Sequence, residues 1–122
     1  MSEHLPAVYQ RFIAEYPDVI EAHHELSRLL HAAGPLSAVE RRLAKLGIAV
    51  GSGSSGAVRS HARKALAEGI SVEALRHVVV LAISTAGFPA AIAAYAWVNE
   101  VVDAEAGATP SGSPSSAAGG PA

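Results

Sequence analysis

A run without any charged residue extends from Val78 to Val98, and it limits the folds open to this chain. The run is long enough to cross a bilayer as a single helix. However, the triplet Gly87-Phe88-Pro89 interrupts it near its middle, and proline is favoured at the first position of a new helix. No cluster of Lys or Arg flanks the run. We therefore expect two consecutive buried helices here and no membrane span.

The rest of the folded part also has a helical pattern. Its apolar residues recur at spacings of three and four, as in amphipathic helices, and no stretch alternates for long enough to indicate a strand. Ser37 and Glu40 form a capping box, and glycines follow several of the apolar segments. The sequence thus predicts an all-α bundle of about six helices, with approximate ranges 5–17, 18–34, 37–50, 55–68, 71–87 and 89–104.

Composition separates one domain from a tail. Residues 1–107 contain all of the charged and large apolar side chains, and we expect them to form one helical domain. Residues 108–122 contain only Ala, Thr, Pro, Ser and Gly. Such a segment buries too little apolar surface to offset its conformational entropy, so we expect a disordered tail.

Charge and cysteine content exclude several classes of protein. The formal net charge is −2 and there is no basic stripe, so a nucleic-acid partner is not expected. The chain has no cysteine, which excludes disulfides and thiolate chemistry and fits a cytoplasmic protein. The first residues lack the apolar core of a secretory signal. His24 and His31 are two turns apart rather than one, so we expect no metal site.

The sixth expected helix indicates how the chain assembles. From Ala90 to Val98 it has no polar face, and a helix that is apolar all round is normally buried on every side. A domain of this size can surround few helices completely. We therefore expect a homo-oligomer, either a trimer or a hexamer, in which other copies complete the core.

Three stretches together resemble the carboxymuconolactone decarboxylase and alkylhydroperoxidase (AhpD-like) family. They are LSAVERRLAKLGIAVG, SHARKALAEGISVEALRHVVVLAI and GFPAAIAAYAWV, and the resemblance covers the chain from Leu36 to Val98. The opening LPAVYQRF and the later AAGPLS also look like a cysteine-free branch of that family. The resemblance implies an AhpD-like helical bundle that works as an oligomer without a cofactor.

The family pattern places an acidic residue before Cys-x-x-Cys-x-x-x-His, and this chain keeps only part of it. The histidine falls on His61, whereas the two cysteines fall on Ser54 and Ala57 and the acid falls on Arg42. Glu40 is near in sequence but about 200° away around the helix. Because a peroxidase needs a thiolate nucleophile, thiol peroxidase activity is disfavoured.

The lactone decarboxylases of this family also work without the cysteine pair, so the resemblance implies a different chemistry. His61 would be a general acid or base, since the ordinary imidazole pKa of about 6.5 suits proton transfer. Ser54 and Ser55, at a helix N-terminus, and Arg42 with Lys45 would bind the carboxylate of a small organic acid or lactone. If the chain is an enzyme, we expect a cofactor-free lyase.

Other interpretations of the same residues remain open. His61 can be a core histidine bonded to a backbone carbonyl, while Arg42 and Lys45 can belong to a solvated face. His77 either converges on the same cavity or lies on a solvated helix flank. The alternative function is a non-catalytic helical module for oligomerisation or assembly.

Overall fold

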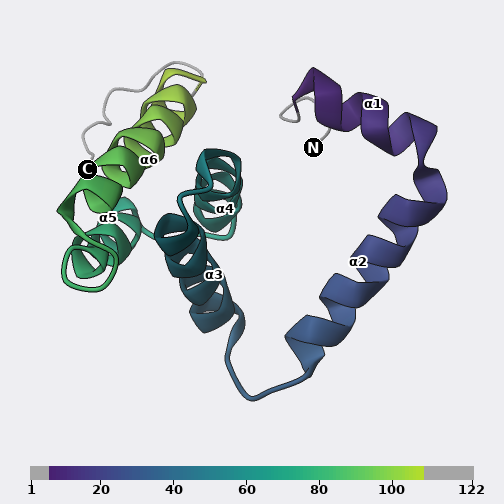
Figure 1. Cartoon of the computed structure of the whole chain (residues 1–122), viewed down its shortest axis with the longest axis horizontal. Helices are drawn as coiled ribbons and strands as arrows, with labels where there is room; N and C mark the ends of the chain where they lie inside the picture. The colour runs from purple at the N-terminus through teal and green to yellow at the C-terminus, as the bar shows by residue number, and fades with distance from the viewer. Residues whose placement is uncertain (1–5, 109–122) are drawn as a thin grey trace. The chain divides into compact units, whose positions relative to one another are not determined.

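The computed structural model describes residues 6–108, and every regular element in that range is an α-helix (Figure 1). The prediction of an all-α fold is confirmed. The described residues form α1 (Ala7–Glu15), α2 (Pro17–Ala32), α3 (Ala38–Ser52), α4 (Ser55–Ala67), α5 (Val72–Ala82) and α6 (Phe88–Ala108). The predicted tail lies, from residue 109 onward, outside the described residues.

The ends of several helices differ from the predicted ranges, and α6 continues to Ala108 rather than ending near Ala104. α3 continues through Gly51 and reaches Ser52, so the glycine- and serine-rich stretch shortens to a tight turn. α5 ends at Ala82 rather than near Gly87, and turns occupy the residues between it and α6. Among residues 6–108, none of the helices combines the length and apolar character that a membrane crossing requires.

Contacts divide the chain into two units, one ending at Pro35 and the other beginning at Leu36. This division lies inside the range 1–107, which was predicted from the sequence to form one domain. The first unit contains α1 and α2, and the second contains α3 to α6. Each unit is described by itself below.

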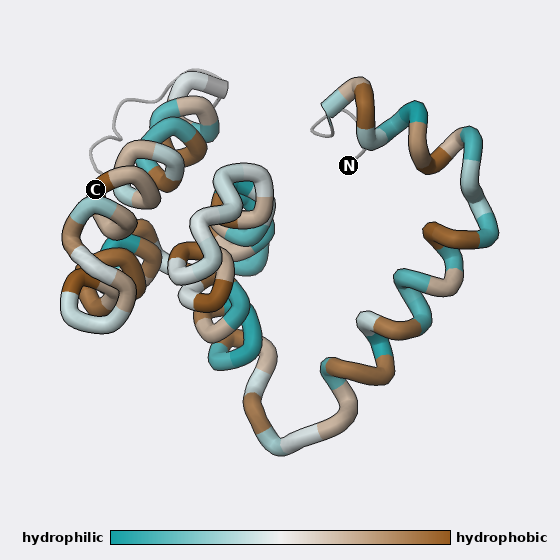
Figure 2. The backbone as a smooth tube through the Cα atoms, viewed as in Figure 1, coloured by the Kyte–Doolittle hydropathy of each residue, from teal (hydrophilic) through white to brown (hydrophobic). Residues whose placement is uncertain are grey.

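The first unit is a pair of helices with little core. Pro17 is the first residue of α2, where a missing backbone N–H costs nothing, and Tyr16 precedes it as the N-cap. The rings of Phe12 and Tyr16 stack with centroids 5.0 Å apart. Within the described part of this unit, Ile20 is the only buried hydrophobic residue. Apolar residues nevertheless recur along α2 among hydrophilic ones, which makes the helix amphipathic (Figure 2).

Local sequence signals position the helices of the second unit. Ser37, Ser54 and Ser71 are the N-caps of α3, α4 and α5, and each hydroxyl accepts a hydrogen bond from the backbone N–H three residues later. The predicted capping box is present, since Glu40 also accepts from the N–H of Ser37 at 2.8 Å. Gly53 ends α3 with φ +71°, a conformation that favours glycine.

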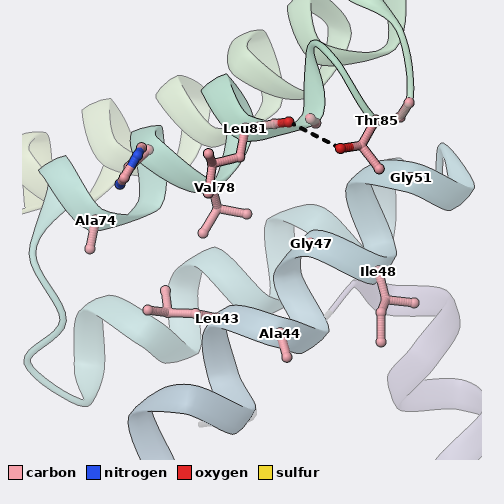
Figure 3. A pocket seen from close by; sticks show the side chains of 12 residues that line it. Leu43, Ala44, Gly47, Ile48, Gly51, Ala74, Val78, Leu81 and Thr85 are labelled. Carbon is pink, nitrogen blue, oxygen red and sulfur yellow. Dashed lines mark hydrogen bonds between the residues drawn. The ribbon is translucent and has the colours of Figure 1, made fainter.

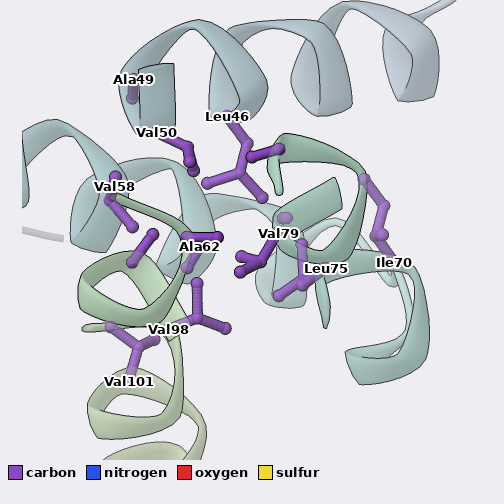
Figure 4. Close-up of a cluster of buried hydrophobic side chains, with 14 residues drawn as sticks. Leu46, Ala49, Val50, Val58, Ala62, Ile70, Leu75, Val79, Val98 and Val101 are labelled. Atoms are coloured by element: carbon purple, nitrogen blue, oxygen red, sulfur yellow. The ribbon is translucent and has the colours of Figure 1, made fainter. Parts of the chain in front are cut away.

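Small and medium apolar side chains from all four helices form the core of the second unit (Figure 4). The largest fully buried ones are Leu46, Leu75, Val50, Val58 and Val98. The many alanines in α4 and α6 let these helices approach closely. This core fixes α3 beside α4, and the candidate site described below lies on these two helices.

α6 is buried along one side only, within its unit. The buried side includes Ala91, Ala94, Val98 and Val101. On another side, Phe88 is 59%, Ile92 is 50% and Tyr95 is 41% exposed. The expectation that this helix is enclosed on every side is therefore not met by one copy of the chain.

Candidate functional site

His61 lies in the second turn of α4, beside the core. Its neighbours on the same helix face, Val58 and Ala65, are fully buried, whereas the imidazole itself is half-buried. This position follows from the helical repeat, because residues three and four apart share a face. His61 thus lies at the boundary between the core and the surface, next to α3.

Arg42 of α3 joins His61 to a carboxylate at the end of α4. Its Nη1 atom lies 2.9 Å from Nδ1 of His61. Its Nε and Nη2 atoms donate to the two carboxylate oxygens of Glu68, at 3.0 and 2.8 Å. This is the bidentate geometry in which arginine binds carboxylates most strongly. We call these three residues the Arg42–His61–Glu68 cluster.

The surroundings of the cluster strongly disfavour a charged imidazole. Burial, together with the positive charges of Arg42, Lys64 and Lys45, lowers the pKa of His61 from 6.5 to about 4. The negative charge of Glu68 raises the same pKa, but by less than the other effects lower it. This pKa is lower than the ordinary imidazole value used in the sequence-based hypothesis, mainly because the ring is partly buried, and also because Arg42, Lys64 and Lys45 add positive charge nearby. His61 is therefore neutral at physiological pH.

Lys45 and Lys64 add positive charge around the cluster. Lys45 lies one turn after Arg42 on α3, and Lys64 lies one turn after His61 on α4. Burial and the charges of Arg42 and Lys45 lower the pKa of Lys64. The predicted pairing of Arg42 and Lys45 on one side of α3 thus places both charges near His61.

The two predicted serines lie farther away. Ser54 is the N-cap of α4, and its hydroxyl accepts from the backbone N–H of Ala57 at 3.3 Å. Ser55 is the first residue of the helix. At 1.5 Å per residue, the seven-residue separation from Ser54 to His61 corresponds to about 10 Å along the axis. The structure therefore gives Ser54 a structural role and does not bring either serine against the imidazole.

His77 lines a different hollow. An apolar groove of about 570 Å³ lies between α3 and α5, and Leu43, Gly47 and Val78 are among the residues that line it (Figure 3). The exposed His77 is at this groove, whereas Arg42 and His61 are not among its lining residues. Of the predicted site residues, the structure groups Arg42, Lys45 and His61, and it places His77 apart from them.

Two residues of the site were not predicted from the sequence. Lys64 follows His61 by three residues on α4, and Glu68 follows it by seven as the C-cap of that helix, so this spacing puts both on or near the face of His61. The family pattern places its acid before the histidine, and so it does not point to an acid that follows it. A search for acids one and two turns after His61 would have found Glu68.

Within residues 6–108, no group of three or more His, Asp or Glu side chains could hold a metal ion. The groups at the site are instead two lysines, an arginine, a carboxylate and a neutral imidazole. This set suits the binding of an anion with an oxygen acceptor, and it contains no thiol for redox chemistry.

Fold and site together define an all-α protein with a cysteine-free polar site centred on a histidine. The model of the carboxymuconolactone decarboxylase family matches residues 16–100, and the chain belongs to this family. The match begins just before α2, ends within α6 and contains the whole Arg42–His61–Glu68 cluster. No curated protein and no solved structure matches the chain.

Proposed function

We propose that this cysteine-free member of the family binds a small organic acid or lactone at His61 and catalyses a decarboxylase-type reaction without a cofactor. The observation that carries the proposal is the half-buried Arg42–His61–Glu68 cluster with Lys45 and Lys64 beside it. Three cationic groups and one carboxylate surround the imidazole, so the local charge favours an anionic ligand.

The chemistry suits such a site. In a ligand whose carboxylate is β to a carbonyl, the bond between the carboxylate and the α-carbon breaks and CO₂ leaves. The electron pair passes through the α-carbon onto the carbonyl oxygen, and the resulting enolate then takes a proton from water at carbon, which leaves hydroxide. Positive charge and hydrogen-bond donors held in place around the enolate oxygen lower the barrier to this step.

A comparison of three histidine variants tests the proposal. His61→Leu removes both ring nitrogens at similar volume, and we expect it to abolish CO₂ release and weaken ligand binding by tenfold or more, as for a lost hydrogen bond to a charged group. His24→Gln, an exposed position in the first unit, is the control and leaves both unchanged. CO₂ release is assayed with 2-oxotetrahydrofuran-3-carboxylate, a γ-lactone whose carboxylate is β to the ring carbonyl. Calorimetry with paraconate, a γ-lactone whose carboxylate lies one carbon farther from that carbonyl, measures binding alone. If His77→Gln rather than His61→Leu weakened binding, the site would be the α3/α5 groove and the proposal would be wrong.

We further propose that the chain assembles as a homo-oligomer, a trimer or a hexamer, and that assembly is its role if it has no catalytic activity. The exposed apolar residues Phe88, Ile92 and Tyr95 recur at spacings of four and three along α6, so they form one stripe. A second copy of the chain would cover such a stripe by packing an apolar helix face against it.

Sedimentation velocity tests the assembly. Ile92→Asp places a carboxylate in the middle of the stripe, and we expect it to lower the sedimentation coefficient to that of a single chain. Ala104→Asp introduces the same charge at an exposed position of α6 outside the stripe and serves as the control. A wild-type chain that sediments as a monomer at all concentrations would contradict this proposal.

A further inference from the structure

The hydrogen bond between Arg42 and His61 determines which ring nitrogen carries the proton. A guanidinium has only N–H donors and stays charged in proteins. Nδ1 of His61, 2.9 Å from Nη1, must therefore accept. A neutral imidazole that accepts at Nδ1 carries its proton on Nε2.

Glu68 keeps Arg42 in this orientation. Both of its carboxylate oxygens accept from Arg42, through Nε and Nη2, and Nη1 is left to point at the imidazole. The Arg42 side chain is only 13% exposed, so its planar group has little freedom to turn away. Within the described residues, the ring of His61 has no other hydrogen-bond partner, and its Nε2–H is left to bond a molecule from outside.

We infer that His61 works as a neutral hydrogen-bond donor whose Nε2–H binds an oxyanion of the ligand, and that Arg42 is the positioning residue that fixes this tautomer. The part about the ligand rests on the proposed function. The part about the tautomer depends only on the contacts within the chain.

The charged groups that face His61 support this role from both helices packed at the site. Arg42 and Lys45 on α3 and Lys64 on α4 favour a neutral imidazole and attract an anion, while Glu68 opposes them. A base would need a free lone pair, but the lone pair of Nδ1 is used by Arg42. A neutral donor can instead stabilise negative charge on a carboxylate or enolate oxygen without a proton transfer of its own.

The first experiment measures the tautomer in the ligand-free, ¹⁵N-labelled protein. A long-range ¹H–¹⁵N correlation spectrum at neutral pH distinguishes a protonated from an unprotonated ring nitrogen. We expect His61 to show a protonated Nε2 and an unprotonated Nδ1. A protonated Nδ1 would overturn the assignment of Arg42.

Variants of Arg42 separate positioning from a merely structural effect. Arg42→Met removes the donor, so we expect mixed tautomers and a pKa of His61 that rises from about 4 toward 6.5. Arg42→Lys retains one donor and restores part of the Nε2–H population. Arg63→Met, on α4, is the control and leaves the tautomer unchanged. A pure Nε2–H tautomer in a folded Arg42→Met protein would overturn the positioning role. If Arg42→Met does not fold, the spectra of the wild-type protein and of Arg42→Lys test that role instead.

The second experiment adds succinate, paraconate or inorganic phosphate to the same sample. We expect the carboxylates to shift the Nε2–H signal and to raise the pKa of His61, because an anion at Nε2 favours the charged ring. His61→Gln, whose amide can donate, retains more affinity than His61→Leu. A response to phosphate alone supports the oxyanion donor but excludes a carboxylate as the ligand.

The two experiments distinguish the possible failures. If the ligand-free protein shows the Nε2–H tautomer but none of the three probes affects His61, the proposed function and the oxyanion donor are wrong, and the positioning by Arg42 stands. If a probe binds the wild-type protein, and binds His61→Leu more weakly, but does not change the Nε2–H signal of the wild-type protein, the proposed site stands and the donor role is wrong.

Discussion

Arg42 and Glu68 are 26 residues apart in sequence, yet two parallel hydrogen bonds of 3.0 and 2.8 Å join their side chains across α3 and α4. The pair links the second turn of α3 to the C-cap residue of α4. It also carries the only carboxylate among the groups that set the pKa of His61.

Glu68→Gln retains the shape of the side chain but removes its charge. Because Glu68 raises the pKa of His61, we expect this pKa to fall further below about 4 in the variant. The free energy of unfolding should fall by only about 1 kcal/mol, since Glu68 is 43% exposed and solvent screens the pair. Titration of the His61 ring protons by NMR gives the pKa. Glu73→Gln on α5 is the control, and an unchanged or higher pKa in Glu68→Gln would contradict the electrostatic role of Glu68.

The stability of the folded chain should depend on pH through His61. Its pKa is about 4 in the folded state and about 6.5 in the unfolded state, so the unfolded chain binds more protons between these values. The contribution of neutral His61 to the free energy of unfolding is complete above pH 6.5, and it is lost as the pH falls toward 4. After allowance for solvent screening of a half-buried group, we expect a loss of about 1–2 kcal/mol.

Urea denaturation at a series of pH values measures this dependence, and His61→Gln is the reference because glutamine does not titrate. The difference between the two proteins isolates the histidine from carboxylates that titrate in the same range. A constant difference from pH 7 to pH 4 would contradict the lowered pKa.

Ser54→Ala separates the two roles that the sequence suggested for this residue. Its hydroxyl caps α4, so we expect a loss of about 1 kcal/mol in the free energy of unfolding. Because Ser54 lies about 10 Å along the helix from His61, ligand affinity should be unchanged. Ser71→Ala, which removes the same kind of cap from α5, is the matched control. An affinity that fell in Ser54→Ala but not in Ser71→Ala would return Ser54 to the binding site.

Leu46 and Ile48 on α3 offer a direct test of the core. Leu46 is fully buried, whereas Ile48 is 70% exposed at the α3/α5 groove. Leu46→Ala should destabilise the chain by about 2–5 kcal/mol, because it removes buried apolar contacts and leaves a cavity. Ile48→Ala should change stability by about 0.5 kcal/mol or less. Thermal or urea unfolding compares the two variants, and equal losses would mean that Ile48 is covered in solution.

Much of the fold could be predicted from the sequence because its signals are local. The caps Ser37, Ser54 and Ser71 and the glycine after α4 act on residues within one turn, so their effects can be read without knowledge of the partners. The end of α5 could not be placed in this way. The turns between Ala82 and Gly87 contain no glycine or proline that would mark the end of a helix, and no charged residue interrupts the run there.

The site was harder to predict because its contacts join different helices. The sequence suggested that Arg42 either binds a ligand carboxylate or lies on a solvated face, and it gave no sign that Arg42 pairs with Glu68 of its own chain. His77 was expected either beside His61 or on a solvated flank, and the packing of α5 on α3 places it at a separate groove. Such contacts depend on helix crossing and side-chain rotamers, and neither has a sequence pattern.

The position of Trp97 has a practical consequence for studies of this protein. It is the only tryptophan in the chain; it packs against the core of the second unit, and the guanidinium carbon of Arg59 lies 5.9 Å from the centre of its ring. Fluorescence excited selectively at tryptophan therefore reports on the second unit alone. Circular dichroism reports on helices in both units, so a difference between the two melting curves would reveal whether α1 and α2 unfold separately.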